Sequence, residues 1–179
     1  MKEISISILT FLLMTLTSNA QFNSDIRDLP TITLLNSKLG KDCPPGRVTD
    51  ACWQREIKAS IGDTIGVQFY YHNTSEYDAV NVALGLNIDT ANKNDRYVIN
   101  GGILVNGKKD VMGYAQVLVS KSTKLKFISK SVTWFPNQSE IGVPLVNGEL
   151  LFSNYGYGIG IIAPGWQSQG TMIMMFVVQ

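Results

Sequence analysis

Residues 64–72 read TIGVQFYYH, and large apolar side chains occupy every second position of this stretch. Ile65, Val67, Phe69 and Tyr71 therefore lie on one side of an extended chain, because successive side chains of a β-strand point to opposite faces. Alternation of this length is typical of a strand that has one face in a hydrophobic core. The stretch predicts such a strand and, with it, a β-sheet protein.

The segment that follows repeats this pattern after a polar turn. Residues 79–88 read AVNVALGLNI, with apolar side chains at alternate positions: Val80, Val82, Leu84, Leu86 and Ile88. Shorter extended stretches lie at 31–34, 53–58, 97–99, 103–105, 115–119, 124–128, 132–135 and 172–178. With no amphipathic helix among them, about eight to ten strands predict an all-β, antiparallel β-sandwich, and a closed barrel is the alternative.

The 179-residue chain has the composition of a globular domain, with 45% hydrophobic and 16% charged residues. Its formal net charge of +1 gives no electrostatic reason to expect nucleic acid or an anionic membrane as a partner. One histidine and two cysteines exclude a zinc finger. We expect a short polar lead at 21–30 and one sandwich domain at 31–179.

The first twenty residues have the features of a secretory signal peptide. Lys2 precedes an apolar stretch at 4–16, and Ser18-Asn19-Ala20 offers the small residues that a signal peptidase recognises. The alternative is a membrane anchor, which needs about 20 apolar residues, more than this stretch holds. We therefore expect cleavage after Ala20, a mature chain without a membrane span, and a secreted, extracellular or cell-surface location.

The two cysteines agree with such a location. Cys43 and Cys52 flank a turn-forming Pro-Pro-Gly sequence, and two lone cysteines of an exported protein are expected to form a disulfide. A redox-active pair is the alternative, although the spacing is not Cys-x-x-Cys. Beyond this disulfide loop at 43–52, Trp53 and Ile57 are expected on one side of a short strand.

Four segments together resemble an immunoglobulin-like repeat of bacterial and archaeal surface proteins. They are ASIGDTIGVQFYYHNT at 59–74, DAVNV at 78–82, VTWFPN at 132–137 and IAPGW at 162–166. The family is a domain-of-unknown-function-eleven type, and the likeness is to versions in poorly characterised environmental bacteria. The resemblance implies an immunoglobulin-like sandwich in an extracellular setting, and it implies no catalysis.

Catalytic equipment is sparse in this sequence. His72 is the only histidine, and a general base needs a nucleophile and an orienting acid beside it. Ser75, Glu76 and Asp78 are near in sequence, but side chains of a turn usually point into water. We therefore expect His72 to be a surface residue at a strand end and the protein not to be an enzyme.

No cofactor is expected, with calcium as the alternative. An acidic and amide-rich loop offers oxygen ligands for that ion but lacks the order of an EF-hand: Asp89, Asn92, Asn94 and Asp95. A basic cluster offers a polyanion site as a further alternative: Lys108, Lys109, Lys121, Lys124, Lys126 and Lys130.

Two groups of residues are candidates for contact with a partner. Tyr155 and Tyr157 alternate with glycines and, with Trp166, offer aromatic surface to a protein or a sugar, although glycine beside an aromatic residue also marks a strand bend. Ile32 and Leu34 belong to a strand that is a candidate for pairing with the sheet of a neighbouring subunit, and pairing within its own subunit is the alternative.

The sequence thus predicts a secreted, non-catalytic structural or cell-surface protein. Its partner is itself or another surface protein, and a filament or surface-layer subunit that pairs through strand edges is the leading hypothesis. The alternative is an extracellular carbohydrate-binding or adhesive module with a glycan partner. Nucleic acid is not expected.

Overall fold

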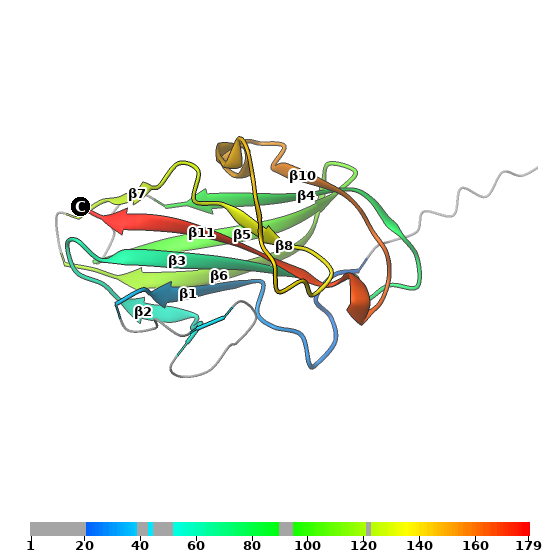
Figure 1. The fold of residues 1–179 in the computed structure, drawn as a ribbon, viewed down its shortest axis with the longest axis horizontal. Coiled ribbons are helices and arrows are strands. Elements are labelled where there is room, and N and C mark those ends of the chain that lie inside the picture. Colours follow the sequence, from blue (N-terminus) through cyan, green and yellow to red (C-terminus); the bar gives the residue numbers. More distant parts are fainter. Residues whose placement is uncertain (1–20, 39–42, 45–51, 90–94, 121–122) are drawn as a thin grey trace, which may run out of the picture.

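The computed structural model describes residues 21–38, 43–44, 52–89, 95–120 and 123–179. These residues form eleven β-strands and two short 3-10 helices, and the strands make two sheets that face each other (Figure 1). The predicted all-β sandwich is confirmed. The strands outnumber the expectation because four of them are only two or three residues long.

The first sheet has six strands in the order β1-β3-β11-β8-β9, with β7 also paired to β11. All its pairings are antiparallel. Phe69 is central, with Ile32 on one side and Met172 on the other. The strands are β1 (Ile32–Asn36), β3 (Thr64–Tyr71), β7 (Leu125–Phe127), β8 (Thr133–Phe135), β9 (Val143–Pro144) and β11 (Gly170–Val178).

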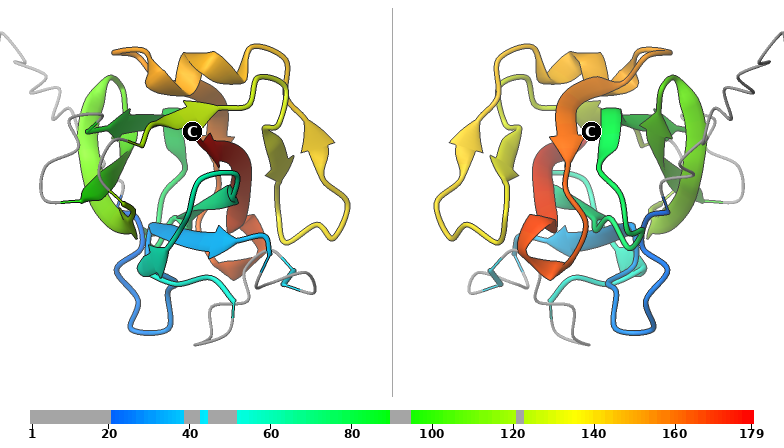
Figure 2. Two further views of the ribbon diagram at one scale, coloured as in Figure 1. Left: turned by 90° about the vertical axis from the view of Figure 1, so that its left-hand side faces the viewer. Right: turned by 90° about the vertical axis from the view of Figure 1, so that its right-hand side faces the viewer.

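The second sheet has five strands in the order β10-β4-β5-β6-β2. They are β2 (Glu56–Lys58), β4 (Ala79–Ile88), β5 (Arg96–Val105), β6 (Lys108–Leu118) and β10 (Tyr157–Ile162). β2 runs parallel to β6, so the expectation of purely antiparallel sheets is corrected. Figure 2 shows β8 and β9 as an arm beside the two layers and helix η1 (Gly148–Phe152) across one side.

The core lies between the sheets and follows the alternation of β3 and β4. The four predicted apolar residues of β3 are fully buried, as are Val82 and Leu84 of β4. Val80 departs from the prediction and is 40% exposed. Asn81, next to it, has a φ of 52°, which interrupts the extended backbone and turns Val80 away from the core.

The strand β5 runs unbroken through a pair of glycines that interrupt its apolar pattern in the sequence. A Cβ on Gly101 would lie 2.6 Å from Cγ1 of Ile32 and 2.9 Å from Cε2 of Phe69. On β6, a Cβ on Gly113 would lie 2.6 Å from Cβ of Thr31. The bare backbone at these two positions therefore allows β1 to approach the five-stranded sheet closely.

The strand β1 pairs within its own chain. Ile32 and Leu34 are fully buried and lie opposite Phe69 and Val67 of β3. The free edge of β1 is covered by Gln54, whose backbone N–H and C=O both bond to Leu34. The predicted intersubunit strand at Ile32 and Leu34 is thus corrected, because the core of this subunit takes both side chains.

A turn at Gly62-Asp63 leads into β3, and it is held by the Asp63 carboxylate. Oδ2 accepts hydrogen bonds from the Asn36 side chain at 2.8 Å and from the Ser60 backbone at 3.0 Å. Oδ1 pairs with the ammonium of Lys38. These contacts, with Lys38 the largest influence, lower the pKa of Asp63 to about 2 from its ordinary value of 3.8.

Gly101→Ala should destabilise the sandwich by about 1–3 kcal/mol, because the new methyl group would push β1 away from the sheet. Gly158→Ala is the matched control, since a Cβ there meets no atom within 4 Å. It should change the free energy of unfolding by no more than about 0.5 kcal/mol. Urea unfolding of both variants measures the difference, and equal stabilities would contradict the close approach.

Asp63→Asn should lower stability by about 1–2 kcal/mol at pH 7, discounted for the solvent around Lys38. Because the pKa of Asp63 is lower in the folded state, its ionised form stabilises the fold above pH 3.8. That contribution is lost as the pH falls toward 2, so the difference between variant and wild type should shrink over this range. Thermal unfolding from pH 7 to pH 2 checks this, and a constant difference would count against it.

Candidate functional site

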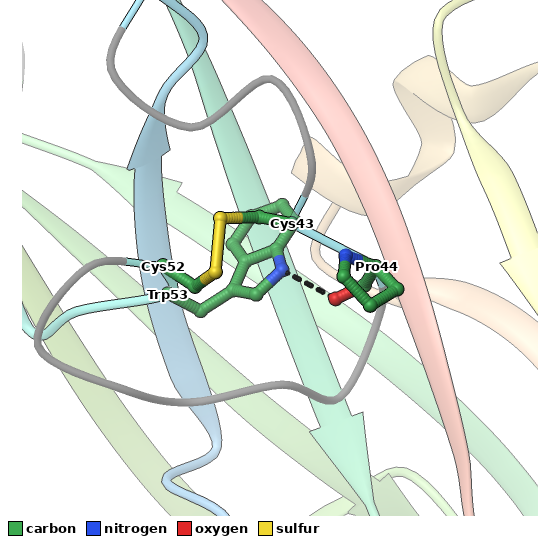
Figure 3. The surroundings of a disulfide bond; sticks show 4 residues. All are labelled: Cys43, Pro44, Cys52 and Trp53. Carbon is green, nitrogen blue, oxygen red and sulfur yellow. Dashed lines mark hydrogen bonds between the residues drawn. A yellow bond between two sulfur atoms is a disulfide. The ribbon is translucent and has the colours of Figure 1, made fainter.

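The disulfide bond and Trp53 lie on the outer face of the six-stranded sheet, in an apolar cluster with Leu35 and Ile173. Cys43 and Cys52 form the predicted disulfide, with their Cα atoms 5.4 Å apart. Next to it, Trp53 is buried against the outer side of β3, where its ring would lie 3.0 Å from a Cβ on Gly66 (Figure 3). The indole Nε1 donates to the Pro44 carbonyl at 2.9 Å, which ties the ring to the loop.

Trp53 and Ile57 do not share a face, contrary to the prediction. Ile57 of β2 is buried in the main core between the sheets. Trp53 instead joins Leu35 and Ile173 in a separate apolar cluster on the outside of the six-stranded sheet. The chain crosses from one sheet to the other between these residues, so the alternation of a single strand does not apply to them.

The three aromatic residues predicted as a contact surface do not form one platform. Tyr155 is 87% exposed, whereas Tyr157 is half-buried and packs against the main core. Trp166 is half-buried in helix η2 (Trp166–Ser168), at the opposite end of β10 from Tyr155 (Figure 1). Only Tyr155 therefore remains a candidate for contact through an exposed ring.

His72 is buried in a polar cluster, which corrects the expectation of a surface position. Its side chain is 3% exposed, and Nδ1 lies 2.7 Å from Oδ1 of Asp28, which is equally buried. Nδ1 carries the proton in this pair because a carboxylate only accepts hydrogen bonds. Nε2 is buried without a partner among the described residues. The orienting acid thus comes from the lead at 21–30 and not from the turn beside the histidine.

Asp28 is the centre of this cluster. Besides His72, its Oδ1 lies 3.0 Å from the hydroxyl of Tyr70, and its Oδ2 accepts the backbone N–H of Asp25 at 2.7 Å. The Tyr70 hydroxyl also lies 2.8 Å from Oε1 of Gln169. Burial raises the pKa of Tyr70, and the negative charge of Asp28 adds to this effect, so the phenol stays neutral and serves as a donor.

Trp166 closes the cluster from outside. Its indole packs on the imidazole of His72, with ring centroids 4.2 Å apart, and the Arg27 guanidinium lies 4.6 Å from the indole centroid. Arg27 in turn makes two hydrogen bonds to Asp25, at 2.7 and 2.9 Å, and they hold the pKa of that carboxyl well below its usual range. Trp166, predicted to contact a partner, instead packs on His72 of its own subunit.

These contacts fix the polar lead to the end of β3. Phe22 is buried, and its N–H donates to Asp110 at 3.0 Å. Asn23 exchanges hydrogen bonds with the backbone of His72 through its own N–H and its side-chain oxygen. The arrangement can therefore hold the lead at 21–30 in place. Both carboxylate oxygens of Asp28 already accept hydrogen bonds within the cluster. The sequence offers little warning of it, because Asp28 and His72 are 44 residues apart.

A hollow of about 620 Å³ lies beside this cluster. Tyr70 and Gln169 line it, and their polar atoms are already bonded to each other. Pro44 forms one side, and its neighbours at 45–51 lie outside the described residues. The hydroxyl of Tyr70 is therefore engaged within the fold, whereas the lining also holds further polar side chains, among them Gln138, Ser139 and Glu140.

A groove of about 370 Å³ on the outer face of the five-stranded sheet is different. Asn87 of β4 and Asn100 of β5 lie side by side across the strands, and Asn154 joins them from the segment after η1. In the part of the chain that the structure describes, the amides of these three residues make no side-chain hydrogen bond. They are therefore free to bond a ligand.

Glycines give the groove its depth. Gly85 and Gly102 lie opposite each other on β4 and β5 and form the floor. One wall of the groove is the segment that starts at Phe152. This segment packs directly on β4 at Gly156, where a Cβ would come within 2.6 Å of the Leu84 carbonyl oxygen. Gly156 also has a φ of 69°, which favours glycine.

Met112 and Lys109 of β6 complete the lining of the groove. Met112, 55% exposed, lies across from Gly102, and Lys109 also lines the groove. Tyr114 is 49% exposed opposite Asn100, and the guanidinium of Arg55 lies 5.0 Å from its ring centroid. The lining of the groove thus combines free amides, the thioether of Met112 and the ammonium of Lys109, a set that can bind a ligand through hydrogen bonds, and Arg55 lies outside this lining.

Neither a metal cluster nor a membrane helix emerges from the described residues. Among them, no group of three or more His, Cys, Asp or Glu side chains is placed to hold a metal ion. Of the candidate calcium loop, Asn92 and Asn94 lie outside the described residues. The described part of the chain also holds no helix with the length and apolarity that a membrane crossing requires.

No family model, curated protein or solved structure matches this chain. The resemblance to the immunoglobulin-like surface repeat therefore remains a prediction.

Asp28→Asn should destabilise the protein by about 2–3 kcal/mol, because the carboxylate accepts hydrogen bonds from three groups in a buried position. Asp78→Asn is the matched control, since Asp78 is exposed. Urea unfolding gives the stabilities, and hydrogen exchange at the Asn23 and His72 amides should accelerate in the Asp28 variant alone. Unchanged exchange at these amides would contradict the role of Asp28 in holding the lead.

Proposed function

We propose that this protein is an extracellular, non-catalytic carbohydrate-binding or adhesive module, and that its ligand lies in the groove on the five-stranded sheet. The observation that carries the proposal is the set of unbonded amides, Asn87, Asn100 and Asn154, around a glycine floor. Each amide offers both a donor and an acceptor. Such groups match the hydroxyls of a sugar, which also donate and accept.

The described strand edges favour contact through side chains over pairing of strands. The edge of β1 is covered by Gln54, and β9 is two residues long and contains Pro144. The edge strand β10 has register shifts around Gly158 and Gly160. Short, bulged and proline-bearing edges resist pairing with another chain. A filament built through strand edges thus has less support than a surface that binds with its side chains.

An extracellular location is part of the proposal. The disulfide between Cys43 and Cys52 supports it, because such bonds persist in oxidising compartments. The signal-peptide pattern of residues 1–20, which lie outside the described part, supports it as well. A ligand on the outside of a cell or in its matrix is consistent with both features.

A glycan array probed with residues 21–179 should show saccharide binding, and Asn87→Ala/Asn100→Ala should weaken it at least about tenfold, the loss of roughly 1.4 kcal/mol. Asn87 is exposed and Asn100 is half-buried, and neither makes a side-chain hydrogen bond with a described residue, so the double variant should unfold at the wild-type temperature. Gln167→Ala, which removes an exposed amide from η2, is the control and should bind as the wild type does. Absence of saccharide binding, or equal binding by the double variant, would refute the proposal.

A further inference from the structure

The charges of the five-stranded sheet and its border balance overall. The strands hold four cations and two anions, Glu56 and Asp110: Lys58, Arg96, Lys108 and Lys109. Arg55 borders the sheet, and so do three anions: Asp78, Asp89 and Asp95. The positive charge is therefore local to the groove, because Lys109 lines it and no carboxylate is among its described lining residues. An anion would be attracted to the groove itself.

Two of these cations flank the groove at separate points along β6. Lys109 lines the groove itself, and Arg55 lies over the ring of Tyr114. Lys109 and Tyr114 of β6 lie opposite Leu104 and Asn100 of β5, so at about 3.3 Å per residue they are roughly 13 Å apart. Among the described residues that line the groove there is no carboxylate. Asn100 lies opposite Tyr114, and Asn87 lies opposite Asn100. A ligand that runs along β6 would thus meet Lys109 at one end, the thioether of Met112 in the middle, and the free amides with Arg55 at the other end.

We infer that the ligand is an acidic polysaccharide, a chain of sugar rings that bear carboxylates. One carboxylate pairs with Lys109 and another with Arg55, while ring hydroxyls bond to Asn87 and Asn100. The apolar face of a sugar ring lies on Met112. This inference rests on the proposed function and names the ligand class of the same groove.

Nucleic acid, the other polyanion that such a face attracts, fits less well. Single strands bind by stacking their bases on aromatic faces, but the Arg55 guanidinium already lies over the ring of Tyr114. A nucleic acid bound through its phosphates alone would also give the amides of Asn87 and Asn100 no specific hydrogen-bond partner. Hydroxyls on neighbouring ring carbons give these amides direct partners.

Polygalacturonate and its fully methyl-esterified form make a matched pair of probes, because esterification removes the charge and keeps the sugar backbone. The wild type should bind the acid form at least about tenfold more tightly than the ester. Lys109→Gln should remove most of this preference. Lys126→Gln, on β7 of the other sheet, is the control and should retain it. Calorimetry at two salt concentrations should show weaker binding of the acid form at the higher one.

The outcomes separate this inference from the proposed function. Equal binding of acid and ester, or binding of neutral glycans alone, would overturn the acidic ligand and leave a carbohydrate-binding module. No binding of any saccharide would overturn both. Double-stranded DNA bound as tightly as polygalacturonate would overturn the inference in favour of a general polyanion surface. Loss of the preference in the Lys109 variant alone would support it.

Discussion

The strand β3 is buried on both of its faces, and this constraint determines how much of the rest of the chain must pack around it. One face fills the core with Ile65, Val67 and Phe69, as alternation dictates. The other face carries Gln68 and Tyr70, which are also buried. Polar groups out of contact with water must find hydrogen bonds, so a second layer of chain has to cover this outer face and supply partners. The disulfide bond with Trp53, and the polar lead, together form that layer.

The two covering segments are held by different interactions, apolar packing in one and buried hydrogen bonds in the other. Trp53 brings apolar area onto the glycine of β3 and is tied to the disulfide loop through its indole N–H. The lead brings Asp28, whose buried carboxylate has three partners and so offsets its own desolvation. Trp166 then shields the imidazole of His72 from water. The Asp28–His72 pair, a combination that also occurs in active sites, here holds the lead at 21–30 against β3.

Because the cover lies on one sheet only, the sandwich has two unlike outer faces. The five-stranded sheet has no comparable layer among the described residues, and its outer side holds Asn87, Asn100 and Met112 around bare glycines. The amides of Asn87 and Asn100 have no side-chain hydrogen bonds within the described residues, in contrast to those of Asn23 and Asn36 on the covered side. This asymmetry is the physical basis for assigning structure to one face and contact to the other.

The alternation of residues 64–72 by itself determined β3 and its core-facing side chains, because strand periodicity is a local property. The number of such stretches indicated an all-β protein, and the sequence likewise predicted the Cys43–Cys52 disulfide, whereas the tertiary structure decided for two sheets over a closed barrel. Only the tertiary structure decided that His72 meets Asp28, that β1 stays in its own subunit, and that β5 runs through Gly101. Each of these depends on groups distant in the chain, and the space that one side chain leaves for another cannot be inferred from local periodicity.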